Sequence, residues 1–330
     1  MSGTMNERRN FMKTAGAAAA GIALATGARA DDRGDFISSV RNARIFDLSH
    51  TWDENSPIAG VNPPYEMVLN KTHADFTTPD DPGTRGMFDP DRQLSFTSEI
   101  QKWSGQHGAP SIDAIGHIGH NGRLFGGVDA AKATSDPRGI GRSGVGAHLD
   151  IAHYPKELLV NRGVLLDVAR FIQRNSDPLP PAFNITDEHL AETARHQGVR
   201  IRKGDTVLIR TGWGKLFTAD PVTYKCDNAA GVGVAGARHL VRAKPAVVGN
   251  DTLTFEVRPP IAFPPDVPLF QVFPVHMILI PDNGINIIEN YFLEEIAAAK
   301  EYEFLLVVPP IKIRGGTGSA LRSFAMVPRG

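Results

Sequence analysis

The sequence predicts an α/β fold in a single domain, and three observations lead to this prediction. Short runs of β-branched and aliphatic residues recur along the 330 residues, bounded by Gly, Pro or Asp as expected for buried strands. Helical patterns lie between these runs, so strands and helices are mixed along the chain. No stretch with the composition of a linker and no internal repeat divides the sequence.

Each predicted strand is a short apolar run that stops at a turn-forming residue. In chain order, the predicted strands cover residues 43–48, 164–168, 206–210, 246–248, 277–280, 285–288 and 304–308.

Two helices are predicted from their termini. Thr186 is a good N-cap residue, and Asp187 and Glu188 follow it in the first turn, where the helix dipole favours negative charge. This helix is expected to end at Gly198, because glycine tolerates the left-handed conformation that ends many helices. A second helix is expected after Glu289.

Two other segments have no regular periodicity. Residues 57–92 are rich in Pro, Gly and Asp, so we expect a long irregular excursion that covers a pocket or a neighbouring subunit. Residues 315–319 (Gly-Gly-Thr-Gly-Ser) predict a sharp turn, with pocket lining as the alternative. No Lys follows this run as it does in a phosphate-binding loop, and no G-x-S-x-G elbow supports a serine hydrolase.

The N-terminus has the features of a twin-arginine export signal. Glu7-Arg8-Arg9-Asn10-Phe11-Met12-Lys13 is followed by a short apolar run over 15–25 and by a small-x-small cleavage site at 28–30. We therefore expect a signal peptide over 1–30 and one domain over 31–330, exported to the periplasm by the twin-arginine machinery. The apolar run is too short for stable membrane insertion.

Charge and cysteine content exclude several classes of protein. Removing the four basic residues and one acidic residue of the signal from the totals of 35 and 36 leaves 31 and 35, a net charge of −4. This balance argues against nucleic acid and anionic membranes as partners. Cys226 is the only cysteine, so neither an intrachain disulfide nor a thiolate metal cluster is possible. Stability must come from the core and from oligomerisation.

The densest group of chemically active residues lies between His107 and His120. His107, Asp113 and His117 are separated by small or apolar residues, and imidazole and carboxylate groups are common ligands of divalent metals. On an extended strand His107 and Asp113 would face the same side, whereas Pro110 is equally consistent with a bend. The alternative explanation is that each of these polar residues caps a helix or meets a buried partner.

His276 and Glu289 lie at the two ends of a strongly apolar stretch. Glu289 is equally well explained as the cap of the helix that follows, and His276 as a core residue with a hydrogen-bond partner. Trp103, Phe125 and Phe273 suggest an apolar or aromatic pocket, although core packing explains them about as well.

Five segments of the chain occur in the order typical of one family, over nearly the whole mature sequence. They are residues 46–50 (Phe-Asp-Leu-Ser-His), 162–168, 203–213, 249–252 (Gly-Asn-Asp-Thr) and 315–319. On these segments the chain resembles the cyclase family that includes bacterial kynurenine formamidase and isatin hydrolase. The resemblance implies a single α/β domain of swivelling β/β/α type and a homo-oligomer, either a dimer or a tetramer.

The resemblance also implies a metal site. The family motif H-x-x-x-H-x-D-x-x-x-H falls on His107, Ser111, Asp113 and His117, and the family's later ligands fall on His276 and Glu289. Ser111 therefore replaces a histidine ligand. The implied cofactor is Mn²⁺ or Zn²⁺, as one or two ions, with His117 as the proton shuttle.

The function implied is hydrolysis of a small cyclic amide, lactam or lactone by metal-activated water, with His117 as general acid/base. Ser111 leaves three outcomes open: one ion held by His107, Asp113, His276 and Glu289, a substitute ligand such as Gln106 or His120, or loss of both metal and activity. The alternatives are a metal-assisted cyclase or dehydratase and a non-catalytic periplasmic protein that binds a small molecule. Ser111, His120 and Trp103 remain tentative metal or substrate residues.

Overall fold

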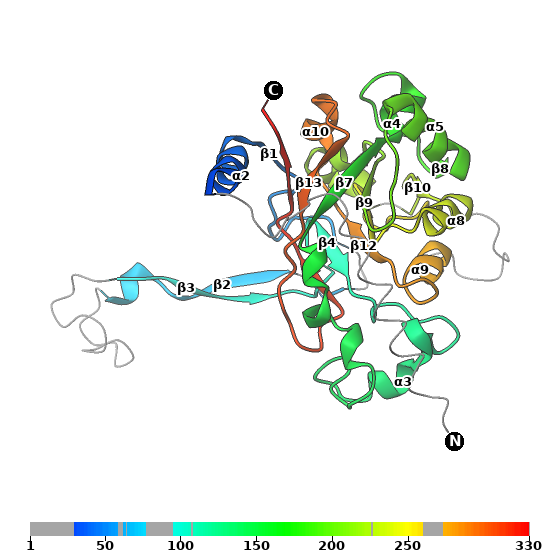
Figure 1. Cartoon of the computed structure of the whole chain (residues 1–330). Helices are drawn as coiled ribbons and strands as arrows, with labels where there is room; N and C mark the ends of the chain where they lie inside the picture. Colours follow the sequence, from blue (N-terminus) through cyan, green and yellow to red (C-terminus); the bar gives the residue numbers. More distant parts are fainter. Residues whose placement is uncertain are drawn as a thin grey trace.

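The structure is a computed structural model that describes residues 30–58, 62–63, 65–76, 95–106, 108–225, 227–259 and 273–329. Its centre is a nine-stranded mixed sheet in the order β1-β15-β13-β7-β9-β11-β12-β4-β14 (Figure 1). Strands β7, β9, β11 and β12 run parallel to one another, and the remaining neighbours pair antiparallel. The predicted α/β class is confirmed.

The strands of this sheet are β1 (Arg44–Asp47), β4 (Ser111–Asp113), β7 (Val160–Asp167), β9 (Thr206–Arg210), β11 (Val247–Asn250), β12 (Asn286–Glu289), β13 (Glu303–Val307), β14 (Gly318–Ala320) and β15 (Phe324–Val327). Three two-stranded ribbons pair β2 (Glu66–Lys71) with β3 (Ser98–Lys102), β5 (Arg123–Leu124) with β6 (Val128–Asp129), and β8 (Asn184–Ile185) with β10 (Gly231–Val232). The helices are α2 (Ala30–Asn42), α3 (Ala130–Ala133), α4 (Val168–Gln173), α5 (Asp187–Gln197), α6 (Leu216–Ala219), α7 (Pro221–Tyr224), α8 (Val234–Ala243), α9 (Pro274–Leu279) and α10 (Glu294–Ala298).

Both faces of the sheet are buried, which explains why its central strands are continuous apolar runs. In β7, Val164 and Leu166 join one core cluster with side chains of α5, α8 and α9, whereas Leu165 joins a second cluster with α10 on the opposite face. This alternation follows from the two-residue period of a strand. Helices α5, α8 and α9 therefore lie together on one side of the sheet (Figure 1).

Most predicted strands are confirmed. The prediction for 206–210 coincides with β9, and the other confirmed runs overlap β1, β7, β11, β12 and β13 with shifts at their ends. The prediction for 277–280 is wrong, because these residues lie in and just after α9. A short apolar run does not distinguish a buried strand from a buried helix. Here Pro274 occupies the start of the helix, where no backbone N–H is needed.

The predicted caps of α5 are confirmed. The Thr186 hydroxyl accepts a hydrogen bond from the His189 N–H, and the Thr186 N–H donates to Nδ1 of His189, so the pair forms a capping box. Gly198 ends the helix with a φ of 70°. The helix expected after Glu289 is α10.

The expectation of an irregular segment over 57–92 is only partly correct. Strand β2 and a 3₁₀ turn (His73–Phe76) lie within it, and most of its remaining residues lie outside the described ones. The ribbon of β2 and β3 extends away from the sheet (Figure 1). The turn predicted for 315–319 is present at Gly315, which has a φ of 82°, and it leads into β14.

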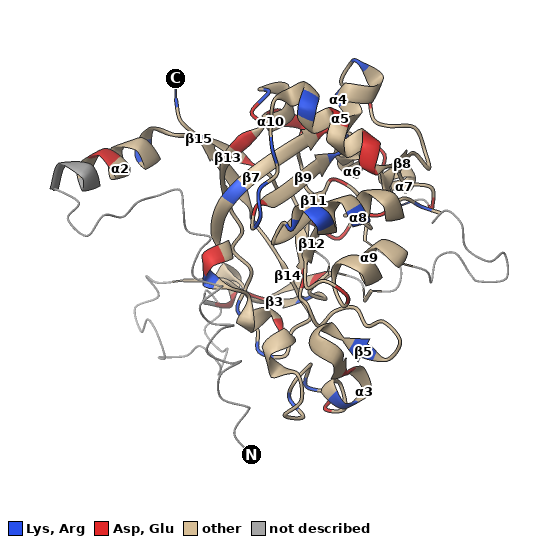
Figure 2. Cartoon of the chain, turned by 45° about the vertical axis from the view of Figure 1, so that its right-hand side comes forward, with Lys and Arg blue, Asp and Glu red and all other residues tan. Residues whose placement is uncertain are grey.

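Figure 2 shows Lys and Arg residues interspersed with Asp and Glu residues along the ribbon of the chain, rather than gathered by sign. Among the described helices, none is both long enough and apolar enough to cross a membrane.

Candidate metal centre

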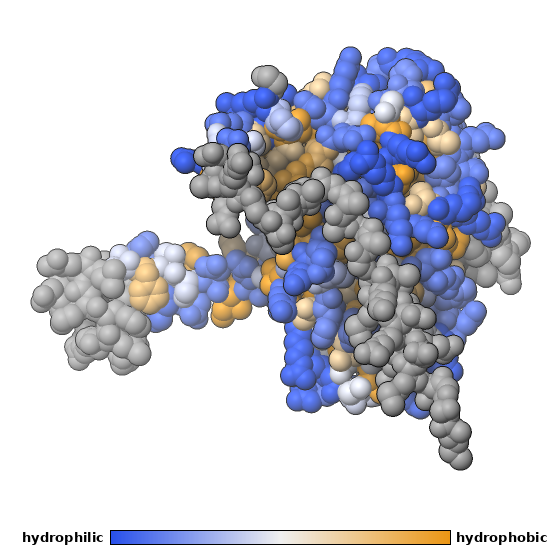
Figure 3. All heavy atoms as spheres, in the orientation of Figure 1, coloured by the Kyte–Doolittle hydropathy of each residue, from blue (hydrophilic) through white to orange (hydrophobic). Residues whose placement is uncertain are grey.

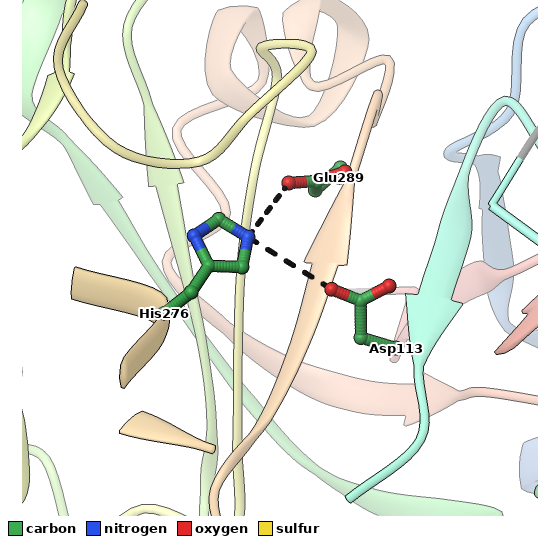
Figure 4. A group of neighbouring side chains, drawn as sticks. All are labelled: Asp113, His276 and Glu289. Carbon is green, nitrogen blue, oxygen red and sulfur yellow. Dashed lines mark hydrogen bonds and ion pairs between the residues drawn. The ribbon is translucent and has the colours of Figure 1, made fainter. Parts of the chain in front are cut away.

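Three of the predicted ligands meet at one point of the structure. Ligand atoms of Asp113, His276 and Glu289 all lie within 4.8 Å of one another, and the side chains point toward a common centre (Figure 4). Nε2 of His276 lies 3.2 Å from Oε1 of Glu289 and 3.8 Å from Oδ2 of Asp113. All three side chains are almost entirely buried, with exposed fractions of 4%, 4% and 12% for Asp113, His276 and Glu289.

The register of the sheet produces this meeting. Strands β4 and β12 are antiparallel neighbours, with Ser111 opposite Glu289. Residues directly opposite each other, and residues two apart on one strand, project from the same face. Ser111, Asp113 and Glu289 therefore share a face, which is the one covered by α9, and α9 contributes His276. Asp113 and Glu289 are far apart in the sequence, so the sequence alone does not show that they lie close together.

The electrostatics of the group favour a bound cation. Burial and the negative charge of Asp113 raise the pKa of the Glu289 carboxyl, against the opposing effect of its hydrogen bond with His276. Burial disfavours a charged His276 ring, but hydrogen bonds with Glu256 and Glu289 outweigh it and raise the pKa of His276. Both shifts reflect several carboxylates crowded into a dry site. A divalent cation would offset this negative charge and replace the proton that His276 and Glu289 would otherwise hold.

The donor set fits a divalent ion. With metal–ligand bonds of about 2.1 Å, neighbouring ligand atoms lie roughly 3–3.5 Å apart around one ion. The separations of 3.2 and 3.8 Å about Nε2 of His276 are close to this spacing. A shell of imidazole nitrogen and carboxylate oxygen suits Mn²⁺ or Zn²⁺.

His117 lies beside this group and remains partly accessible. Its Nε2 lies 3.8 Å from Oδ1 of Asp113, and 29% of its side chain is exposed. On the other side of the ring, the Gln106 amide nitrogen lies 3.3 Å from Nδ1 and also donates to the Thr317 hydroxyl. Gln106 reaches this position because Gly318 has no side chain: a Cβ there would lie 2.4 Å from the amide nitrogen.

Ser111 lies on the same face as the ligands, with its side chain buried. Its hydroxyl has no hydrogen-bond partner within the described part of the chain, which is unusual for a buried polar group. This unpaired oxygen is consistent with a further group in the site. His107, the other ligand predicted for this segment, lies outside the described residues.

The tentative residue His120 does not join the metal group. Its Nδ1 lies 2.9 Å from a carboxylate oxygen of Asp282 at the surface. Trp103 packs edge-on against Trp52, with ring centroids 5.8 Å apart, next to the β2–β3 ribbon. Of the aromatic residues suggested for the pocket, Phe273 contacts the ring of His276 edge-on at 5.2 Å.

One residue of the site was missed by the sequence analysis. Glu256 lies in the segment that follows β11, and its Oε1 is 2.6 Å from Nδ1 of His276. No spacing pattern in the sequence points to it. The nearest signal is its position shortly after the 249–252 segment, which marks the end of β11.

Comparison with protein families and solved structures gives matches along most of the chain. The family model described as "Putative cyclase" matches residues 46–257, and the model of the twin-arginine translocation pathway signal sequence matches residues 5–25. Among curated proteins, none matches the chain.

Solved structures share the fold. A crystal structure described as a novel cyclase is 26% identical, with 88% of this chain and 92% of that chain covered and a TM-score of 0.71. Isatin hydrolase A from Ralstonia solanacearum is 17% identical, with 92% and 100% covered and a TM-score of 0.65. A potential metal-dependent hydrolase with cyclase activity is 17% identical, with 86% and 99% covered and a TM-score of 0.53.

Proposed function

The chain belongs to the cyclase family, and from this premise we propose that it is an exported, metal-dependent hydrolase of a small cyclic amide, lactam or lactone. The observation that carries the proposal is the convergence of Asp113, His276 and Glu289 on one buried point. The isatin hydrolase and the metal-dependent hydrolase among its structural relatives support the same class of reaction.

Asp113, His276 and Glu289 would hold one Mn²⁺ or Zn²⁺ ion, with His107 as a further ligand. When bound, such an ion polarises a carbonyl group and lowers the pKa of water toward neutrality. The fold would exclude bulk water from the ligand side chains and hold them in a fixed orientation. Ser111 stands where the family motif has a histidine, so we propose one ion rather than two.

His117 would move the proton. Nε2 of His117 faces Asp113, and with its lone pair free this nitrogen would be able to take up a proton. From that position His117 would take a proton from the attacking water and deliver it to the leaving nitrogen or oxygen. Its partial exposure lets it reach a substrate that enters from solvent.

The match to a twin-arginine signal supports export, and we propose that the protein acts in the periplasm after passage through the twin-arginine machinery. We also propose that the chain forms a homo-oligomer, either a dimer or a tetramer.

The test uses the mature chain, residues 31–330, loaded with Mn²⁺ or Zn²⁺. We expect turnover of at least one member of a panel of lactones, lactams including isatin, and formamides. Turnover should disappear after chelation and return when the metal is restored. Full metal loading without turnover of any compound would favour the non-catalytic binding protein. Formation of a ring or loss of water instead of hydrolysis would favour the cyclase or dehydratase, and turnover that survives chelation would contradict the metal mechanism.

A further inference from the structure

We propose that Glu256 is a positioning residue that fixes both the orientation and the tautomer of His276, so that Nε2 is presented to a metal ion. The inference rests on the proposed metal-dependent function. Glu256 itself does not touch the ligand point formed by Asp113, His276 and Glu289, because it approaches the opposite edge of the imidazole ring.

Glu256 binds the ring and its backbone at once. Its Oε1 lies 2.6 Å from Nδ1 of His276, and the backbone N–H groups of Val275 and His276 donate to its two carboxylate oxygens at 3.1 and 3.4 Å. These N–H groups belong to the first turn of α9, where a helix has no carbonyl of its own to pair with them. One carboxylate therefore anchors both the start of the helix and the side chain that it carries.

The bond to Nδ1 determines what the other nitrogen does. A carboxylate accepts hydrogen bonds and does not donate them, so Nδ1 carries a proton. The lone pair of a neutral ring is then on Nε2, which is the nitrogen that faces Glu289 and Asp113. The ring of Phe273, edge-on at 5.2 Å, borders the same imidazole.

Glu256 is itself held in place. Only 1% of the residue is exposed, and its backbone forms a parallel bridge with Val232. Two hydrogen bonds form this bridge: the Val232 N–H donates to the Phe255 carbonyl, and the Val257 N–H donates to the Val232 carbonyl. A Cβ at Gly231 would lie 2.4 Å from the Glu256 carbonyl carbon, so glycine allows this close approach. The orientation of His276 is therefore tied to the main fold.

The experiment compares metal affinity with stability for two Glu→Gln changes in the full mature chain. Glu256→Gln should weaken Zn²⁺ and Mn²⁺ binding by about 10- to 100-fold, measured by competition with a chelator at fixed pH. Glu294→Gln is the matched control, because Glu294 is a mostly buried carboxylate that pairs with Arg210 and touches none of the ligands. It should lower the free energy of unfolding while changing metal affinity less than two-fold.

A second measurement reads the tautomer directly. In the Zn²⁺-loaded wild type, imidazole ¹⁵N spectra should show a proton on Nδ1 of His276 in a strong hydrogen bond, and this signal should shift in Glu256→Gln. If Glu256→Gln does not fold, both measurements are made on Glu256→Asp, which keeps the charge but shortens the reach, and weaker binding is expected there. Wild-type affinity with an unchanged ¹⁵N signal in the variant that folds would overturn the inference. Absence of metal binding by the wild type would instead overturn the proposed function.

Discussion

At the residue scale, His117 and the three buried ligands differ in ways that separate their roles. Asp113, His276 and Glu289 are buried and share one point, whereas His117 is partly exposed and contacts only Asp113 among them. We therefore predict that His117→Ala lowers kcat by at least about 100-fold, the usual contribution of general acid/base catalysis. Metal content, measured by elemental analysis, should be unchanged.

The matched control for His117 is His120→Ala, three residues away. Because His120 pairs with Asp282 at the surface, this change should leave kcat within a few-fold of the wild type. Loss of the metal in His117→Ala would show that His117 is a ligand and contradict the assignment.

His50 gives a prediction about pH. Its ring stacks on Phe217 at 4.0 Å, and burial lowers the pKa of His50 from 6.5 to about 4, although a backbone hydrogen bond with Tyr291 opposes the shift. The unfolded chain therefore binds this proton first as the pH falls. The contribution of unprotonated His50 to the free energy of unfolding should be fully present above about pH 6.5. It should fall by up to about 3 kcal/mol as the pH drops to about 4.

Urea unfolding at several pH values tests this contribution. The pH dependence between 6.5 and 4 should be smaller in His50→Gln, which cannot titrate, and unchanged in His148→Gln, whose side chain is exposed. An identical pH dependence in wild type and His50→Gln would contradict the burial argument.

At the element scale, the parts of the fold that could be predicted are those set by local sequence. The ends of α5 follow from Thr186 and Gly198, and β9 is a self-contained apolar run. The nature of 277–280 could not be predicted, because a short apolar run fits either a strand or a helix. The site depends on the pairing of β4 with β12, and no local pattern fixes a pairing between segments so far apart in the chain.

Two threonines of helix α5 provide a prediction at this scale. Thr186→Ala removes the capping hydroxyl and should lower the free energy of unfolding by about 1 kcal/mol. Thr193 is fully buried and its hydroxyl has no partner in the described part of the protein. Thr193→Val should therefore be neutral or stabilising. Chemical denaturation of both variants measures the difference, and equal destabilisation by both changes would contradict the capping assignment.

At the scale of the whole molecule, the β2–β3 ribbon exposes a group of apolar side chains. Val68 lies opposite Ile100 across the ribbon, and both are more than half exposed, as are Met67 and Leu69. Figure 3 shows hydrophobic residues on the surface of the part that extends from the sheet. A two-stranded ribbon has no second layer on which to bury such residues, and isolated hairpins are at best marginally stable. We propose that a second copy of the chain covers them.

Light scattering after gel filtration tests this proposal. The mature chain should have the mass of a dimer or tetramer, and Val68→Lys combined with Ile100→Lys should shift it toward the monomer. Val222→Lys is the control, since Val222 is a single exposed apolar side chain away from the ribbon. A wild-type monomer, or an unchanged oligomer in the double variant, would contradict the proposal.

We propose that Asp113, His276 and Glu289 form a metal centre in this chain even though Ser111 replaces a histidine of the family motif. Equilibrium dialysis of the mature chain against Zn²⁺ or Mn²⁺, followed by elemental analysis, tests it most directly. We predict one ion per chain in the wild type at saturating metal. At a free metal concentration near the wild-type Kd, where half of the wild-type sites are filled, His276→Ala should bind less than about a tenth of the wild-type amount. No bound ion in the wild type, or equal binding in the variant, would contradict it.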